Sequence, residues 1–272
     1  MILNRLLALP ILLAISPLLP AEDKPDVAGD DKPKAGHSHQ GEAFNQGPRH
    51  SAQPIEGTGN ISFPIRCAWE EGQQFFNQGI GQLHGFWYYE AERTFRQIAA
   101  KAPDCAMAYW GMAMANWENE KRAKVFIKKA TELKENASEQ NQRYIEAQAN
   151  YLDGEPKDAK KRKQELIDDL EGIIQDYPGE IEARAFLCVR LWQFGRSGLP
   201  IHSHQAVDAI LQQIFAINPM HPAHHYRIHL WDGKKAKVAL DSAAKLGQTA
   251  PGIAHMWHCL LYTSDAADEL CR

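Results

Sequence analysis

The sequence is poor in cysteine and has no strong excess of charge of either sign. Five cysteines occur in 272 residues and none forms a C-x-x-C pair, which argues against a thioredoxin-type site, a zinc knuckle and c-type haem attachment. The formal net charge is −4, so we expect no binding of nucleic acid, which requires a basic surface. The motifs G-x-S-x-G, G-x-x-x-x-G-K-[ST] and G-x-G-x-x-G do not occur, so the common hydrolase, phosphate-loop and dinucleotide signatures are missing.

Both ends of the chain are expected to lie outside the folded part. Residues 1–21 contain a short basic start, an apolar run and a small residue before polar sequence, which is typical of a cleaved secretory signal peptide. We therefore expect an exported protein, periplasmic or secreted, without stable membrane insertion. Residues 259–272 resemble translated sequencing-adapter read-through. We expect them to be a non-native tail that replaces a natural C-terminal region of unknown content.

The remaining sequence divides into a linker and a helical region. Residues 22–60 are rich in small and polar residues and nearly lack large apolar ones, so a disordered linker is expected there. Over residues 61–258 apolar side chains recur at spacings of three and four, and β-type alternation is scarce, which predicts an all-α fold. Four prolines are expected to end helical stretches: Pro103, Pro178, Pro219 and Pro251.

Internal repeats organise the helical region. The first unit has its small, aromatic and proline positions at offsets 0, 4, 16, 20 and 28, occupied by Phe75, Gly79, Ala91, Phe95 and Pro103. The second unit follows 32 residues later, with Gly111 and Ala123 at the equivalent small positions. Glycine at such a position lets two helices approach closely, and proline stops the second helix of each pair.

These repeats resemble the tetratricopeptide repeat (TPR) superfamily and, more narrowly, exported bacterial TPR proteins. The matching segments are residues 75–79, 86–95, 103–113, 221–229 and 250–258. The resemblance implies a TPR-like α-solenoid of antiparallel helix pairs that form a right-handed superhelix, with about five units and the start of a sixth. It also implies a non-enzymatic scaffold without a cofactor, whose concave groove binds a protein or peptide.

A cluster of histidines supports an alternative function. His221, His225 and His229 are four residues apart, and His255 and His258 follow at the start of the next unit. First helices of neighbouring units lie side by side, so these imidazoles are able to converge on a divalent transition metal ion. The candidate metal ligands are His225, His229, His255 and His258, in a metal-binding protein or a metal-dependent enzyme. The simpler alternatives are histidines that pack in the core or contact a peptide.

Other residues are candidates for the groove or for a disulfide. The candidate groove residues are His84, Tyr88, His221, His224, His225 and His229. Most of the aromatic cluster around residues 86–89 has the spacing of core residues. Cys67 and Cys105 lie near the starts of successive first helices. They either form a disulfide, which an oxidising compartment permits, or remain two buried thiols.

Overall fold

The computed structural model describes residues 38, 41–153 and 158–258. All regular secondary structure in these residues is helical, which confirms the predicted all-α fold. The α-helices are α1 (Gly72–His84), α2 (Tyr88–Lys101), α3 (Ala106–Ala115), α4 (Glu120–Glu132), α5 (Glu139–Asp153), α6 (Ala159–Asp176), α7 (Ile181–Gly195), α8 (His204–Ile217), α9 (His224–Lys235) and α10 (Leu240–Thr249). Three 3-10 turns accompany them: η1 (Glu42–Phe44), η2 (Lys134–Asn136) and η3 (Ala236–Ala239).

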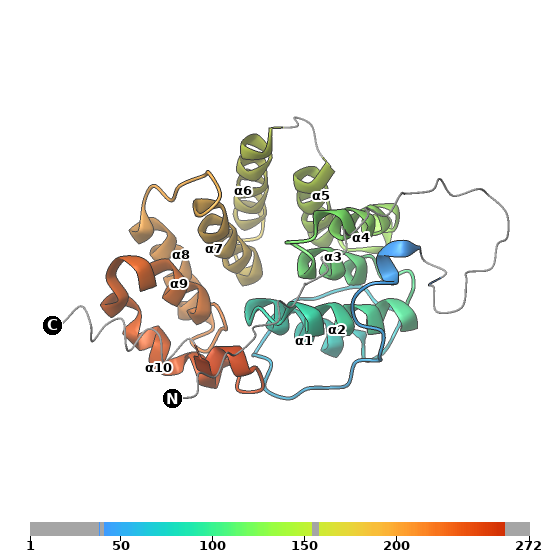
Figure 1. The fold of residues 1–272 in the computed structure, drawn as a ribbon, viewed down its shortest axis with the longest axis horizontal. Coiled ribbons are helices and arrows are strands. Elements are labelled where there is room, and N and C mark those ends of the chain that lie inside the picture. The colour runs from blue at the N-terminus through green and yellow to red at the C-terminus, as the bar shows by residue number, and fades with distance from the viewer. Residues whose placement is uncertain (1–37, 39–40, 154–157, 259–272) are drawn as a thin grey trace, which may run out of the picture.

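Successive helices follow one another around a curved path. Each α-helix packs mainly against its neighbours in the sequence, and Figure 1 shows the path running from α1 through α5 and α6 to α9 and α10. The curve brings the two ends of the array together. The Gly252 N–H donates to the Gly57 carbonyl (2.8 Å), and Ile253 packs against Gly85 after α1. The interior of this curve is therefore enclosed by helices that are distant in the sequence.

The repeat positions have the packing roles expected for them. A single ring, Phe95 of α2, lies against both Gly79 of α1 and Gly111 of α3. A Cβ atom added to either glycine would lie 2.6 Å or 2.5 Å from that ring, respectively, which is far inside van der Waals contact. The four prolines follow the ends of α2, α6, α8 and α10 by two residues. Proline thus ends every even-numbered α-helix except α4.

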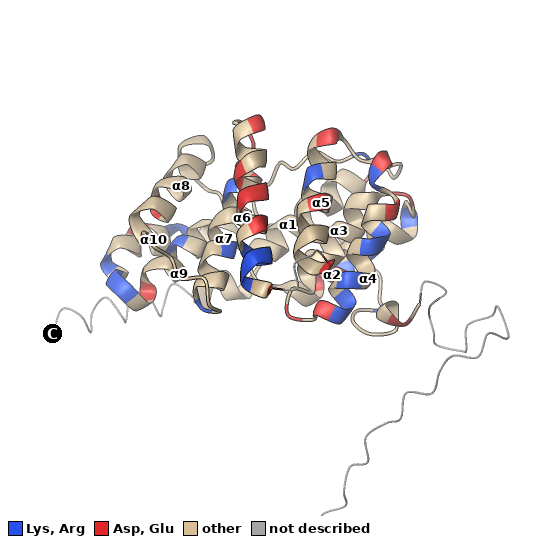
Figure 2. Ribbon diagram, turned by 90° about the horizontal axis from the view of Figure 1, so that it is seen from above, with Lys and Arg blue, Asp and Glu red and all other residues tan. Residues whose placement is uncertain are grey.

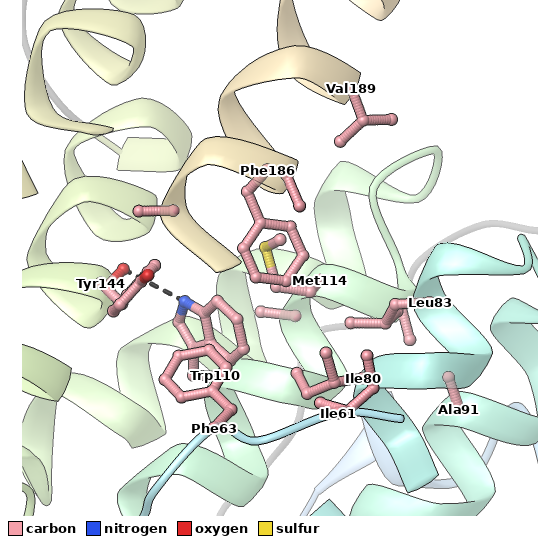
Figure 3. Close-up of a cluster of buried hydrophobic side chains, with 14 of the residues drawn as sticks. Ile61, Phe63, Ile80, Leu83, Ala91, Trp110, Met114, Tyr144, Phe186 and Val189 are labelled. Atoms are coloured by element: carbon pink, nitrogen blue, oxygen red, sulfur yellow. Dashed lines mark hydrogen bonds between the residues drawn. The ribbon is translucent and has the colours of Figure 1, made fainter. Parts of the chain in front are cut away.

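The odd-numbered helices contribute the centre of the core. All ten residues of α3 are buried, as expected of a helix that is apolar on every side. Its Trp110 indole donates to the Tyr144 carbonyl on α5 (3.1 Å) and packs edge-on against Phe186 of α7 at 5.7 Å between ring centroids (Figure 3). Aromatic side chains of α3, α5 and α7 therefore meet at the centre of the core.

Residues 41–60 correct the predicted linker, because they pack against the helices. Ala43 and Ala52 are buried. The Ile55 N–H donates to the side-chain oxygen of Gln78 on α1 (2.8 Å), and the Asn60 carbonyl accepts from the Asn218 side chain (2.9 Å). Amide side chains on the helices therefore satisfy the backbone of a segment that has few apolar residues of its own. Residues 22–37, 39 and 40 of the predicted linker lie outside the described residues.

The segment that leads into α1 is extended and half buried. From residue 61 to residue 69 the odd positions are buried or half-buried, and the even positions are exposed. Phe63 is 1% exposed, and its ring centroid lies 5.4 Å from Phe76, 5.8 Å from Trp110 and 5.0 Å from Tyr144. Through Phe63, this segment contacts α1, α3 and α5 together, in addition to the contacts that the helices make with one another.

The outer helix faces carry charges of both signs. Figure 2 shows both signs of charge on α4, whereas on α6 the Lys and Arg residues lie at the start of the helix and the Asp and Glu residues along the rest of it. Among the described residues, no helix is both long and apolar enough to cross a membrane. The predicted signal peptide (1–21) and non-native tail (259–272) lie outside the described residues.

Candidate metal centre

The candidate metal centre is formed by α9 and by the helical turn at residues 254–258. The turn before α9 is held by His221, whose Nδ1 accepts the backbone N–H of Ala223 (3.0 Å). His225 and His229 lie one helical turn apart on α9 and so project from the same side. His255 comes from the next helical segment. One nitrogen of each of these three imidazoles lies within 4.8 Å of the other two.

The hydrogen bonds of His225 and His229 fix which ring nitrogens carry protons. The Nδ1 of His225 lies 2.7 Å from the His84 carbonyl oxygen, which only accepts, so Nδ1 is protonated and the Nε2 lone pair is free. The Nδ1 of His229 lies 3.2 Å from a carboxylate oxygen of Asp232, so this nitrogen is protonated as well. The two Nε2 atoms are 3.0 Å apart. The lone pair of the His225 Nε2 therefore faces the His229 Nε2 at hydrogen-bond distance, where either a proton on His229 or a metal ion can lie between them.

This arrangement has the dimensions and the support of a metal site. Two imidazole nitrogens bound to one tetrahedral zinc ion lie about 3.3 Å apart, given Zn–N bonds of about 2.0–2.1 Å. The separation of the His225 and His229 nitrogens, 3.0 Å, is close to that value. Metal-binding histidines usually donate the second ring N–H to a carbonyl or a carboxylate. Here the His84 carbonyl and Asp232 accept those bonds.

The environment keeps two of the imidazoles neutral. Burial lowers the pKa of His225 well below its usual value, and the neighbouring His229 and His255 lower it further. Burial also lowers the pKa of His255, with contributions from His229 and His258. Neutral imidazole is the form that binds metal ions.

Aromatic side chains form one wall of the centre. The ring centroid of Phe86 lies 4.3 Å from that of His225 and 5.7 Å from that of His229, with which it is stacked. Trp192 of α7 stacks on His229 at 4.7 Å. Phe86 has a φ of 54°, and among the described residues it is the one non-glycine with a positive φ. Such backbone strain persists where surrounding structure requires it, often at functional sites.

The opposite side of the centre reaches the surface. A cleft of about 330 Å³ opens beside His229 and is also lined by Asp232, Trp192 and His204. His258 is exposed, and its ring centroid lies 6.4 Å from that of His255. The nitrogens that converge are thus those of His225, His229 and His255. The fourth predicted ligand, His258, lies at the rim.

A second histidine cluster is satisfied by hydrogen bonds alone. The fully buried Glu182 carboxylate lies 2.7 Å from the Nε2 of His84 and 3.1 Å from the Nε2 of His221. The His221 Nδ1 accepts a backbone N–H, so its Nε2 carries a proton and donates to Glu182. The Tyr226 hydroxyl, 2.6 Å from the His84 Nδ1, completes the network. Because the His221 Nε2 donates its proton to Glu182, hydrogen bonds satisfy this cluster, although its three ligand atoms also lie within 4.8 Å of one another.

The same cluster shifts the pKa values of its members. Burial alone would raise the pKa of Glu182, but the charges and hydrogen bonds of His221 and His84 outweigh it and hold that pKa far below its usual value. Burial lowers the pKa of His84 against the raising effect of Glu182. The carboxylate therefore stays ionised in the folded protein.

The structure does not place the predicted groove residues on an open surface. His84, His221, His224 and His225 are at most 1% exposed, and Tyr88 and His229 are half-buried. His224 stacks on Phe215 at 3.8 Å and bonds the Ser242 hydroxyl (2.9 Å), so it points away from the metal centre. The prediction of a peptide-binding groove at these residues is therefore corrected for the four buried histidines.

The two candidate disulfide cysteines are free thiols. Cys105 is buried and Cys67 is half-buried. Burial and the neighbouring Cys67 raise the pKa of the Cys105 thiol to about 12. The structure therefore shows two thiols and no disulfide between Cys67 and Cys105.

Several residues of the metal centre and of the neighbouring Glu182 network were not predicted from the sequence. Asp232 follows His229 by three residues, a spacing at which helical side chains meet. Phe86 and Glu182 come from α1–α2 and α7, and no local pattern links them to α9. The alternation of apolar and polar residues over 61–69 was a readable signal for the extended segment.

Comparison of the sequence with protein-family models, with curated proteins and with solved structures found no match.

Proposed function

We propose that this protein binds a divalent transition metal ion through His225, His229 and His255. The observation that carries the proposal is the pair of Nε2 atoms 3.0 Å apart, each on a ring whose Nδ1 proton is already donated to an acceptor. A metal ion can take the place of the proton that these two nitrogens would otherwise share. His255 supplies a third nitrogen within reach.

The donor set defines the class of metal. Imidazole suits zinc, copper and nickel, whereas magnesium and calcium require oxygen ligands. Three histidine ligands leave one position of a tetrahedral zinc ion for water or an exogenous ligand. The cleft beside His229 provides a path to that position.

We also propose that the helices form a TPR-like solenoid. The proposal is supported by one Phe95 ring packed between Gly79 and Gly111, and by prolines that follow the even-numbered helices. The curvature in this chain is strong enough that residues after α1 meet residues after α10. His84 thereby contacts α7 and α9 and brings its carbonyl to His225.

Elemental analysis of the purified full chain tests the metal proposal. Protein loaded with zinc and then desalted is expected to retain one ion per chain. His225→Ala and His229→Ala are expected to retain none. The matched controls are His202→Ala, at an exposed histidine, and His224→Gln, at the buried histidine that precedes His225 but faces away from the centre. Equal metal content in all five proteins would refute the proposal.

A protein-binding scaffold is the second candidate function. It is supported by the cleft beside His229, which is long enough to accept a side chain from a partner, and by the exposed aromatic residues Tyr89 (55%) and Trp257 (46%). A partner would bind to this outer surface, because the centre of the curve is filled by core aromatic residues. Crosslinking at cleft residues, with identification of the captured protein, tests this function. A loss of capture in a His204→Trp variant, which fills the cleft, is expected.

A further inference from the structure

Arg190 of α7 is a buried cation without a carboxylate partner. Arg190 is 3% exposed to solvent. The guanidinium donates from Nη1 to the Gln193 side-chain oxygen (2.9 Å) and from Nη2 to the sulfur of Met114 (3.4 Å). Thioether sulfur is a weak acceptor. No carboxylate in the described part of the chain forms an ion pair with Arg190.

Two other buried arginines have carboxylate partners. Arg122 is 8% exposed and pairs with Glu92. Arg227 is 7% exposed and pairs with Asp208 (2.7 Å) and Asp241. A buried charge is costly unless it is paired and hydrogen-bonded. Arg190 therefore lacks the negative charge that the other two possess.

A small cavity lies beside the Arg190 guanidinium. Its volume is about 20 Å³, and its polar lining comes from Arg190, Gln193, Tyr88, Trp117 and Tyr226. Burial raises the pKa of Tyr88, so its hydroxyl stays protonated and able to donate. The Trp117 indole and the guanidinium are donors only. Because the Tyr226 hydroxyl is already bonded to His84, the donors that the lining offers are those of Arg190, Trp117, Gln193 and Tyr88, and the lining contains no carboxylate.

The shortage of acceptors extends to the other side of the guanidinium. A second void, of about 10 Å³, is lined by Arg190 and by Gln148 of α5. Gln148 is 3% exposed, and its side-chain nitrogen has no hydrogen-bond partner. The Gln148 nitrogen therefore lacks an acceptor in the same part of the core where Arg190 lacks a counter-charge.

We infer that the larger cavity holds one small inorganic anion, of the size of chloride, as the counter-ion of Arg190. A cavity of about 20 Å³ has room for one water-sized particle. A water molecule supplies an acceptor but no charge, and a sulfate or a carboxylate needs more space. A halide supplies the negative charge and accepts the surrounding N–H and O–H groups. This site is separate from the metal centre and does not depend on it, although Phe86 borders both.

Halide-dependent stability tests the inference. The melting temperature of the metal-free full chain is measured from chloride-free buffer to high sodium chloride or bromide, with sodium gluconate holding ionic strength constant. The wild type is expected to gain about 3–6 °C at ten times the halide Kd. Arg190→Met is expected to show no gain. In chloride-free buffer it is expected to be at least as stable as the wild type, because the variant removes an unpaired buried charge.

Two controls and a direct measurement complete the test. Arg196→Met, at an exposed arginine that follows the same helix, and His225→Ala, in the metal centre, are both expected to keep the halide response. Crystals grown in bromide are expected to show an anomalous peak beside the Arg190 guanidinium. No such peak, or an equal halide response in Arg190→Met and wild type, would overturn the inference. Loss of metal binding with the halide response intact bears only on the proposed function.

Discussion

The Nε2 atoms of His225 and His229 face each other at 3.0 Å, and each belongs to a ring whose other nitrogen is committed as a donor. Two hydrogen bonds of the Nδ1 atoms orient these rings. His225 donates to the His84 carbonyl on α1, and His229 donates to Asp232 on α9. The curved arrangement of the helices brings the His84 carbonyl to α9. The curvature of the helical array therefore places the acceptor that orients the His225 ring.

Asp232 is expected to strengthen metal binding without touching the metal. Its carboxylate accepts the Nδ1 proton of His229 and so orients the ring. Removal of such a partner typically lowers metal affinity about 10–100-fold. We predict that Asp232→Asn lowers zinc affinity within this range, measured by competition with a chromophoric chelator. Lys234→Ala, two residues further along α9, is the control and should leave the affinity unchanged.

The close packing of Phe95 predicts that both facing glycines resist enlargement. Gly79→Ala and Gly111→Ala each place a methyl group inside the Phe95 ring contact. Overpacking of this kind costs about 1–3 kcal/mol, to be measured by urea denaturation. A combined Gly79→Ala and Phe95→Leu variant should recover part of the loss relative to the sum of the single changes. A neutral effect of Gly111→Ala would contradict the packing described for the repeat.

A substitution of Phe63 tests whether the segment before α1 contributes to the stability of the fold. Its ring packs among aromatic side chains of α1, α3 and α5. Phe63→Ala is expected to reduce the free energy of unfolding by about 3–5 kcal/mol. Ser62→Ala, at the exposed neighbouring position, is the control and should change it little. A small effect of Phe63→Ala would restore the prediction of a loosely attached segment.

The buried Glu182 network predicts a pH dependence of stability. The folded pKa of Glu182 is lowered, so its contribution is present above the unfolded carboxyl pKa and is lost as pH falls below it. The folded pKa of His84 is also lowered, so the unfolded chain binds more protons than the folded chain below the usual histidine pKa. Both groups make the protein less stable as the pH falls, first through the histidine range and then through the carboxyl range.

Glu182→Gln separates the two contributions. The variant leaves two imidazoles without a charged acceptor, so its stability near pH 7 is expected to fall by about 3 kcal/mol or more. The loss of stability below the unfolded carboxyl pKa is expected to become shallower. Urea unfolding at a series of pH values measures both. If the loss of stability below the unfolded carboxyl pKa were unchanged in Glu182→Gln, Glu182 would not be the group that causes it.

The sequence was sufficient for the helices and for part of the centre. Helical periodicity and Pro103, Pro178, Pro219 and Pro251 located the helix pairs, because both are local properties. The i, i+4 spacing of His225 and His229 is local as well, and it placed two ligands on one helix face. The nearness of His255 followed from the expectation that neighbouring repeats stack.

The rest of the site depends on contacts between distant parts of the chain. His84 and Tyr88 were candidates for an open groove, but the array curves until α1 meets α7 and α9, and these residues become buried. Glu182 lies two residues from both Glu180 and Arg184, and nothing in this local pattern indicates its two histidine partners. Arg190 is similar, because only the fold shows that no carboxylate reaches it.

X-ray absorption spectroscopy of the zinc-loaded full chain tests the central claim most directly. We expect one zinc ion per chain with three imidazole nitrogens at about 2.0–2.1 Å and one further light ligand. The imidazole signal should be lost in His225→Ala and retained in His224→Gln. Zinc surrounded only by oxygen ligands, or the same spectrum in His225→Ala, would contradict the assignment of His225, His229 and His255 as the metal centre.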